Sequence, residues 1–188
     1  LVTSIFTMPY IKEKPNSLKI PLIGEQFNQK EDMNHLIITK GLGCWSNDFD
    51  QKIINYIQRN LFDYNGKIFL DKTLKNILQD IKSTNLNIEV TSLNEEIIST
   101  ATAIIGRPSI GILTESFQYR IPFVAVVGAD DKESINNGRI LNNLYNDMDI
   151  NIIEKDTIAE TRNILNKAKL PVGGQNHIVK IISNVMQK

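Results

Sequence analysis

Residues 102–115, TAIIGRPSIGILTE, decide the fold because a buried strand passes directly into a helix within them. The run Thr102–Gly106 is apolar after its first residue, as expected of a strand that is covered on both faces. Pro108 and Ser109 stand where a helix begins, because proline is favoured in the first turn. The first amides of such a helix lack carbonyl partners and lie at the positive end of its dipole. The stretch therefore predicts a strand, a tight turn and a candidate anion site.

The same alternation of apolar runs and helical patterns extends over residues 35–188. Further strands are predicted at Leu36–Thr39, Lys67–Leu70, Asn87–Thr91, Pro122–Val127 and Ile150–Ile153. Apolar residues at helical spacing predict helices near residues 53–61, 74–81, 97–101, 140–145, 158–168 and 178–186. Strands that alternate with helices are typical of parallel sheets with right-handed crossovers. The predicted class is α/β, an open doubly wound parallel sheet of about six strands with helices on both faces.

Polar residues at the predicted helix starts agree with these boundaries. Ser92–Glu95 (SLNE) and Thr157–Glu160 (TIAE) have the form of capping boxes, in which a hydroxyl and a carboxylate bind the free amides of a first turn. Asp71 follows the second predicted strand, and we interpret it as the cap of the next helix in preference to a ribose ligand.

Residues 1–34 have a different character. Leu1–Met8 predicts one strand, after which Pro9, Pro15 and Pro21 interrupt a polar stretch without helical spacing. We interpret residues 1–34 as the end of a preceding domain plus an interdomain linker. A disordered N-terminal extension is the alternative. Because the sequence does not begin with methionine and has no basic leader, we expect a piece of a longer chain and no signal peptide.

The composition narrows the functional classes. Lys+Arg and Asp+Glu are 21 each in 188 residues, and this zero net charge argues against nucleic acid as the main partner. The longest apolar run, Ile121–Ala129, is about half of what a membrane span needs, so no span is expected and only peripheral contact stays open. The single cysteine, Cys44, favours a reducing compartment, and we expect a cytoplasmic protein. Neither His35 nor His177 has neighbours at metal-ligand spacing, so no metal site is expected.

Three loops follow predicted strands at the edge where ligands of open α/β sheets bind. The first contains Gly41 and Gly43, which allow a phosphate to approach the backbone but suit a simple turn equally well. The second leads to Glu115, a carboxylate within two turns of a helix start, where it can reach a sugar hydroxyl or remain a surface residue. The third, Gly128–Gly138, is polar and precedes a helix.

The second and third loops together resemble a family signature. In GT-B glycosyltransferases related to the UDP-N-acetylglucosamine transferase of peptidoglycan precursor synthesis, a strand ends in Arg, a Glu follows eight residues later, and a Pro seven residues further opens the next strand. Arg107, Glu115 and Pro122 stand at these positions without a gap. Downstream, residues 133–141 (ESINNGRIL) are similar to the family's acidic-Gln-x-x-Asn-Ala-x-x-Leu stretch.

The resemblance implies the C-terminal, Rossmann-like half of such an enzyme, which binds the nucleotide sugar. Glu115 would hold the ribose hydroxyls, the Ser109–Gly111 turn would meet the diphosphate, and Asn137 would lie beside the donor sugar. The Gly41–Gly43 loop would close over the phosphates. The implied donor-binding set is Gly41, Gly43, Arg107, Ser109, Gly111, Thr114, Glu115, Glu133, Ser134 and Asn137. The sequence departs from the family at three positions: Ser109 replaces Gly, Ile112 replaces a hydroxyl residue, and Ser134 replaces the Gln that often contacts the sugar.

The implied reaction moves a sugar from a nucleotide diphosphate sugar, expected to be UDP-linked, to an acceptor that the sequence does not identify. Helix amides, without metal or cofactor, would stabilise the departing diphosphate. The family's catalytic base belongs to the N-terminal domain, so we name no catalytic residue and expect a missing domain or partner subunit. Three alternatives stay open: a UDP-N-acetylglucosamine 2-epimerase-like enzyme, an NAD-dependent oxidoreductase using Gly41, Gly43 and Asp71, and a non-catalytic nucleotide-sugar-binding subunit.

Overall fold

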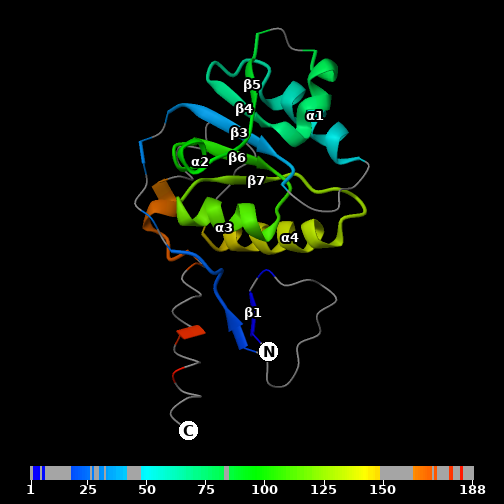
Figure 1. The fold of residues 1–188 in the computed structure, drawn as a ribbon. Coiled ribbons are helices and arrows are strands. Elements are labelled where there is room, and N and C mark those ends of the chain that lie inside the picture. The colour runs from blue at the N-terminus through cyan, green and yellow to red at the C-terminus, as the bar shows by residue number, and fades with distance from the viewer. Residues whose placement is uncertain are drawn as a thin grey trace.

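A five-stranded parallel sheet with the order β5-β4-β3-β6-β7 forms the centre of the protein (Figure 1). The computed structural model describes residues 2–4, 6, 18–25, 27, 30–31, 33–41, 48–82, 85–148, 163–170, 172, 178–179 and 183. The strands are β3 (His35–Thr39), β4 (Lys67–Asp71), β5 (Asn87–Thr91), β6 (Ala103–Gly106) and β7 (Phe123–Ala125). The predicted strand at 150–153 lies outside the described residues.

The order of the strands confirms the doubly wound topology. The chain moves outward from β3 through β4 to β5, then returns to the other side of β3 and continues through β6 to β7. β3 pairs in parallel with both β4 and β6, with Leu36 opposite Ile68 on one side and opposite Ala103 on the other. The direction of winding therefore changes between β3 and β6, and a crevice opens beyond the carboxyl ends of these two strands.

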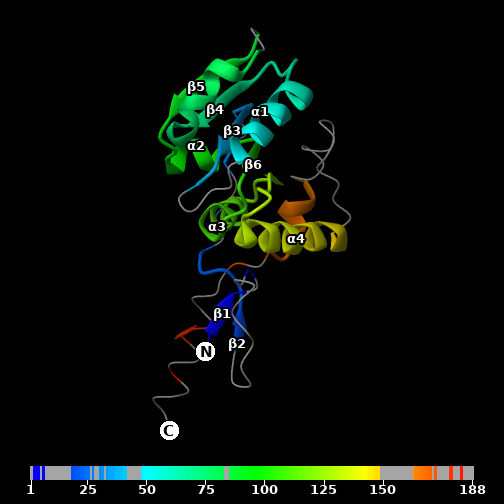
Figure 2. The same cartoon turned by 90° about the vertical axis from the view of Figure 1, so that its right-hand side faces the viewer.

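Helices cover both faces of the sheet, as Figures 1 and 2 show. On one face lie α1 (Phe49–Asn60) and the 3-10 helix η1 (Lys72–Asp80); on the other lie α2 (Glu95–Ser99), α3 (Ile110–Gln118) and α4 (Lys132–Asp147). Alternate strand residues enter two separate cores, with Leu36 and Ile38 facing α1 and Ile37 facing α3. The strands are uniformly apolar because both of their faces are buried.

The helix starts confirm one predicted cap and correct another. Asp71 caps η1, because its Oδ1 accepts a hydrogen bond from the backbone N–H of Thr73 at 2.9 Å. The capping box predicted at Ser92 is wrong, since α2 begins at Glu95 and its cap is Asn94. The Asn94 side chain accepts from the N–H of Ile97 at 2.9 Å. Asparagine at this position serves the same free amides that a serine two residues earlier is too far away to reach.

The N-terminal segment adds a second, smaller sheet. β1 (Val2–Ser4) confirms the strand predicted within residues 1–8, and it pairs in parallel with β2 (Leu18–Ile20), which was not predicted. Figures 1 and 2 show α3 and α4 between this pair and the main sheet. Phe6 and Leu22 are buried in the core on the α3 side. Every helix in the described part of the chain is too short or too polar to cross a lipid bilayer.

Candidate functional site

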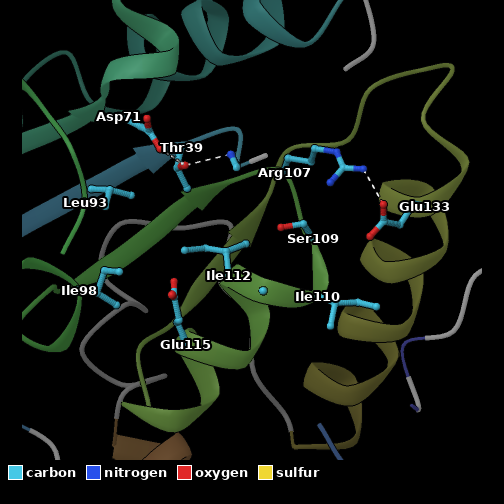
Figure 3. Close-up of a pocket in the computed structure, with 12 residues that line it drawn as sticks. Thr39, Asp71, Leu93, Ile98, Arg107, Ser109, Ile110, Ile112, Glu115 and Glu133 are labelled. Carbon is cyan, nitrogen blue, oxygen red and sulfur yellow. Dashed lines mark hydrogen bonds and ion pairs between the residues drawn. The ribbon is translucent and has the colours of Figure 1, made fainter. Parts of the chain in front are cut away.

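A cavity of about 420 Å³ opens at the carboxyl ends of β3 and β6, where the winding of the sheet reverses (Figure 3). It is therefore at the place where open α/β sheets bind ligands. Of the residues that the sequence singled out as donor-binding, it brings together Gly41, Arg107, Ser109, Gly111, Glu115 and Glu133. The remaining lining residues are Thr39, Asp71, Leu93, Ile98, Ile110 and Ile112. Gly43 lies outside the described residues.

The N-terminus of α3 forms one wall of the cavity. Ser109 is the N-cap, and its backbone carbonyl accepts the first helical hydrogen bond, from Leu113 N–H at 3.0 Å. The Ser109 side chain makes no capping hydrogen bond. The amides of residues 110–112 precede the first intrahelical donor, so they are the free donors of this helix start. A Cβ at Gly111 would meet no atom within 4 Å, which shows that the backbone here faces open space.

The loop after β3 forms the opposite wall and is tied to β4. Gly41 has φ +63°, and its N–H donates to Thr39 Oγ1 at 3.0 Å. Thr39 Oγ1 in turn donates to Asp71 Oδ2 at 2.8 Å, while the other oxygen of Asp71 caps η1. A Cβ at Gly41 would lie 3.2 Å from Ser109 Oγ, so the two walls approach each other closely at this point.

Glu115 projects from the second turn of α3 toward the cavity between Ile98 and Ile112 (Figure 3). The side chain is half-buried, and burial raises the pKa of its carboxyl above the ordinary value. Leu93 and Ile98 make this end of the cavity apolar. The cavity thus combines free amides at one end with a carboxylate in apolar surroundings at the other.

Arg107, at the end of β6, is turned toward α4 (Figure 3). Its Nε donates to Asp131 at 2.5 Å, and its NH2 group donates to Asp131 at 3.2 Å and to Glu133 at 2.8 Å. Burial opposes the charge on Arg107, but the hydrogen bonds and charges of the two carboxylates outweigh this effect and raise its pKa. Burial likewise opposes ionisation of Asp131, yet the bonds from Arg107 and Ser134 keep the pKa of this carboxyl below its usual value.

Three members of the predicted set are not among the residues that line the cavity. Thr114 Oγ1 donates to the carbonyl of Ile110 at 2.7 Å, within α3. Ser134 is buried at the start of α4, where its N–H donates to Asp131 at 3.1 Å. Asn137 is also buried, and its Nδ2 donates to the carbonyl of Pro108 at 2.9 Å. In this structure Asn137 therefore supports the turn behind the cavity.

The sequence reasoning missed the apolar lining residues for a physical reason. Leu93 and Ile98 belong to the β5–α2 loop and to α2, and their spacing is that of ordinary core residues. Only their place after the carboxyl end of β5 marks them, and that becomes visible once the strand order is known. Within the described ranges, no group of three His, Cys, Asp or Glu side chains is arranged to hold a metal ion.

Comparison with solved structures identifies the type of fold. No family model and no curated protein matches the sequence. Among solved structures, MurG of Acinetobacter baumannii matches 83% of this chain and 51% of its own length, with 17% identity and a TM-score of 0.53. The spinosyn forosaminyltransferase SpnP matches 100% of this chain and 55% of its own, with 12% identity and a TM-score of 0.53. The chain spans about half the length of these glycosyltransferases, and it has the fold of one Rossmann-like half of the GT-B type.

Proposed function

We propose that this chain is the donor-binding half of a glycosyltransferase that moves a sugar from a UDP-linked donor without a metal ion. The observation that carries the proposal is that the N-terminus of α3 and Glu115 line one cavity. This cavity lies at the topological switch point between β3 and β6. Free amides suit a diphosphate, and a carboxylate two turns along the same helix suits a pair of ribose hydroxyls. A nucleoside diphosphate carries both groups, and both features lie on one helix at one cavity.

The chemical role of this half is to stabilise the leaving group. When the bond between the anomeric carbon and the diphosphate oxygen breaks, negative charge develops on the diphosphate. Backbone amides that already point into the cavity can receive this charge without reorganisation, which lowers the barrier. The base that activates the acceptor would come from a second domain or a partner subunit. The exposed side chains of Ile23, Phe27 and Met33 offer apolar surface for such a contact.

The NAD-dependent alternative is disfavoured by the hydrogen bonds of Asp71. Both oxygens of Asp71 already accept a hydrogen bond, from Thr39 and from Thr73, so a ribose would have to share this carboxylate with the β3 loop and the η1 cap. NAD therefore serves as the competing ligand in the test. A non-catalytic donor-binding subunit would bind the same nucleotide, and only transfer with the second half added separates it from an enzyme.

A thermal-shift measurement with UDP, UDP-sugars and NAD tests the proposal. At a UDP concentration of about 100 times Kd, binding adds about 2.7 kcal/mol of stability. For a chain of this size, Tm then rises by about 5–10 °C. Glu115→Ala should weaken UDP binding about tenfold or more, because a charged hydrogen-bond acceptor is lost. Glu89→Ala is the matched control and should leave the UDP-induced shift in Tm unchanged. Glu89 is an exposed residue of the edge strand β5, where it pairs with Lys67.

Two results would contradict the proposal. A Tm that rises with NAD and not with UDP would assign the cavity to a dinucleotide. An equal UDP-induced rise in Tm for the parent and for Glu115→Ala would mean that the Glu115 carboxylate does not take part in binding.

A further inference from the structure

We infer that Arg107 is a positioning residue, which fixes the first turn of α3 on the first turn of α4 and so aims the amides that receive the diphosphate. The inference rests on the proposed function, because the diphosphate is the ligand whose binding it explains. A cation in a phosphate site would ordinarily be expected to contact the phosphate directly. Arg107 has a different role here, which is to position the backbone.

The charges around Arg107 argue against direct contact with a phosphate. Its guanidinium has five N–H groups, and three of them serve Asp131 and Glu133. The Arg107 and Asp131 side chains are only 4% and 9% exposed. One cation faces two carboxylates, so the cluster carries a net charge of minus one and offers no surplus attraction to an anion. Figure 3 shows the Arg107 side chain directed at Glu133, with Ser109 below it in this view.

The partners of Arg107 are the residues that start α4. Asp131 is the N-cap of α4, and the oxygen that accepts from Ser134 N–H also receives one bond from Arg107. Glu133 stands in the first turn of the same helix. The side chain at the end of β6 thus grips the cap and the first turn of α4 together. An arginine fork suits this task because its planar N–H groups reach two carboxylates at fixed angles.

A second contact holds the same turn from the same helix. Asn137 Nδ2 donates to the carbonyl of Pro108, the residue between Arg107 and the α3 cap. Gly138 lets α4 approach closely, since a Cβ there would lie 2.9 Å from Val127 and 3.9 Å from Pro108. The turn that precedes α3 is therefore held at two successive residues by α4.

This support matters because the Ser109 side chain makes no capping hydrogen bond to the first amides of α3. Hydrogen bonds weaken steeply when the donor angle departs from linearity, and a misplacement of about 1 Å in a binding site can cost about a hundredfold. A small rotation at residues 107–109 would redirect the amides of residues 110–112 together. Affinity for the diphosphate should depend on the contact between Arg107 and α4, whereas affinity for the nucleoside should not.

Binding of UDP and of uridine to Arg107→Lys tests the inference, with Arg139→Lys as the matched control on the exposed side of α4. Lysine keeps the charge and loses the fork. We expect Arg107→Lys to weaken UDP about tenfold and to change uridine less than about twofold, since uridine uses only the Glu115 end of the cavity. Arg139→Lys should change neither. Equal loss of UDP and uridine would mean general damage to the fold and would overturn the inference.

Glu133→Gln distinguishes positioning from direct contact by the sign of its effect, and it is mild enough to keep the fold if Arg107→Lys does not. If Arg107 bound the phosphates itself, loss of the Glu133 charge would tighten UDP binding. If Arg107 positions the turn, loss of this charged bond should weaken UDP binding about threefold. Tighter binding would overturn the inference.

Amide NMR signals of the ligand-free protein separate this inference from the proposed function. In Arg107→Lys, the signals of residues 109–112 should shift while those of β4 and β5 stay in place. If these signals do not move, the inference is wrong whatever binds. If they move and neither UDP nor uridine binds the parent, the turn is positioned as described and the proposed function fails.

Discussion

The chain segments after the two central strands, β3 and β6, differ in whether their backbone N–H groups are free to bind a ligand. Both segments leave a parallel strand at the same edge of the sheet, and each contributes one glycine to the cavity, Gly41 after β3 and Gly111 in α3. After β3, the Gly41 amide already donates to the Thr39 hydroxyl, which is held by Asp71. After β6, the amides at the start of α3 have no intrahelical acceptor, and their residues line the cavity. The difference favours the start of α3 over the Gly41 loop as the candidate anion site, because the free donors lie there whatever the glycine content.

The largest effect is expected where the two segments leave the sheet. Gly106, the last residue of β6, lies opposite Thr39, the last residue of β3, and a Cβ at Gly106 would lie 1.9 Å from the Thr39 carbonyl oxygen. Gly106→Ala must push the two strands apart and should destabilise the protein by about 3 kcal/mol. A lower urea midpoint with an unchanged slope would measure this loss. A variant as stable as the parent would mean that the strands do not approach this closely.

A matched pair of cavity glycines, Gly41 after β3 and Gly111 in the first turn of α3, sharpens the comparison. Gly41→Ala places a side chain at φ +63° and should cost about 1–2 kcal/mol of stability. Its effect on UDP affinity should stay below about threefold, because the Gly41 amide is already occupied. Gly111→Ala should instead raise stability by up to about 1 kcal/mol, since alanine is favoured over glycine in a helix.

The same Gly111→Ala variant should lose UDP affinity about tenfold, because its methyl group enters the open space before the α3 amides. Urea unfolding measures the stability of both variants, and calorimetric titration measures their affinity for UDP. Loss of UDP binding in Gly41→Ala together with normal binding in Gly111→Ala would reverse the roles of the two loops.

The strands were predictable because burial on both faces forces consecutive apolar residues. The five predicted strands that fall on described residues, such as Thr102–Gly106, are confirmed to within about two residues at each end. The helix expected at residues 74–81 is instead the 3-10 helix η1, a tighter form that the same apolar spacing also satisfies. Local patterns thus predict which face of an element is buried better than they predict its exact hydrogen bonding.

The contacts of the cavity were less predictable because they join residues that are distant in sequence. Arg107 stands 24 residues before Asp131, and Thr39 stands 32 residues before Asp71. Neither pair has a local signature, and each forms only because parallel strands bring their carboxyl ends to one edge. Glu115 could be placed near the start of α3 because helix geometry sets the distance between the two. Spacing alone did not decide between a ligand contact and a surface glutamate, and the ribose role implied by the resemblance stays a prediction.

The smallest expected effect concerns the pH dependence of donor binding, and it separates the Glu115 end of the cavity from the amide end. Burial raises the pKa of Glu115, while backbone amides do not titrate. Ribose hydroxyls donate to the ionised carboxylate, so affinity for a UDP-sugar should fall by a few-fold as the pH drops through the raised pKa of Glu115. A UDP-sugar is preferable to UDP because its diphosphate carries no terminal phosphate that titrates in this range. Titrations from neutral pH to about pH 4 would show the inflection above the ordinary pKa of glutamate.

Glu115→Gln is the control for this pH profile, and its stability supplies an independent check on the sign. The folded protein takes up a proton at Glu115 more readily than the unfolded chain does, so the ionised carboxyl weakens the ligand-free fold at neutral pH. Glu115→Gln should therefore stabilise the ligand-free protein at neutral pH, with a gain that disappears as the pH falls toward the unfolded pKa of glutamate. The same variant should show weaker donor binding that no longer changes with pH. An inflection that persists in Glu115→Gln would place the titrating group elsewhere in the cavity, and Asp71 and Glu133, which also line it, would be the next carboxylates to replace.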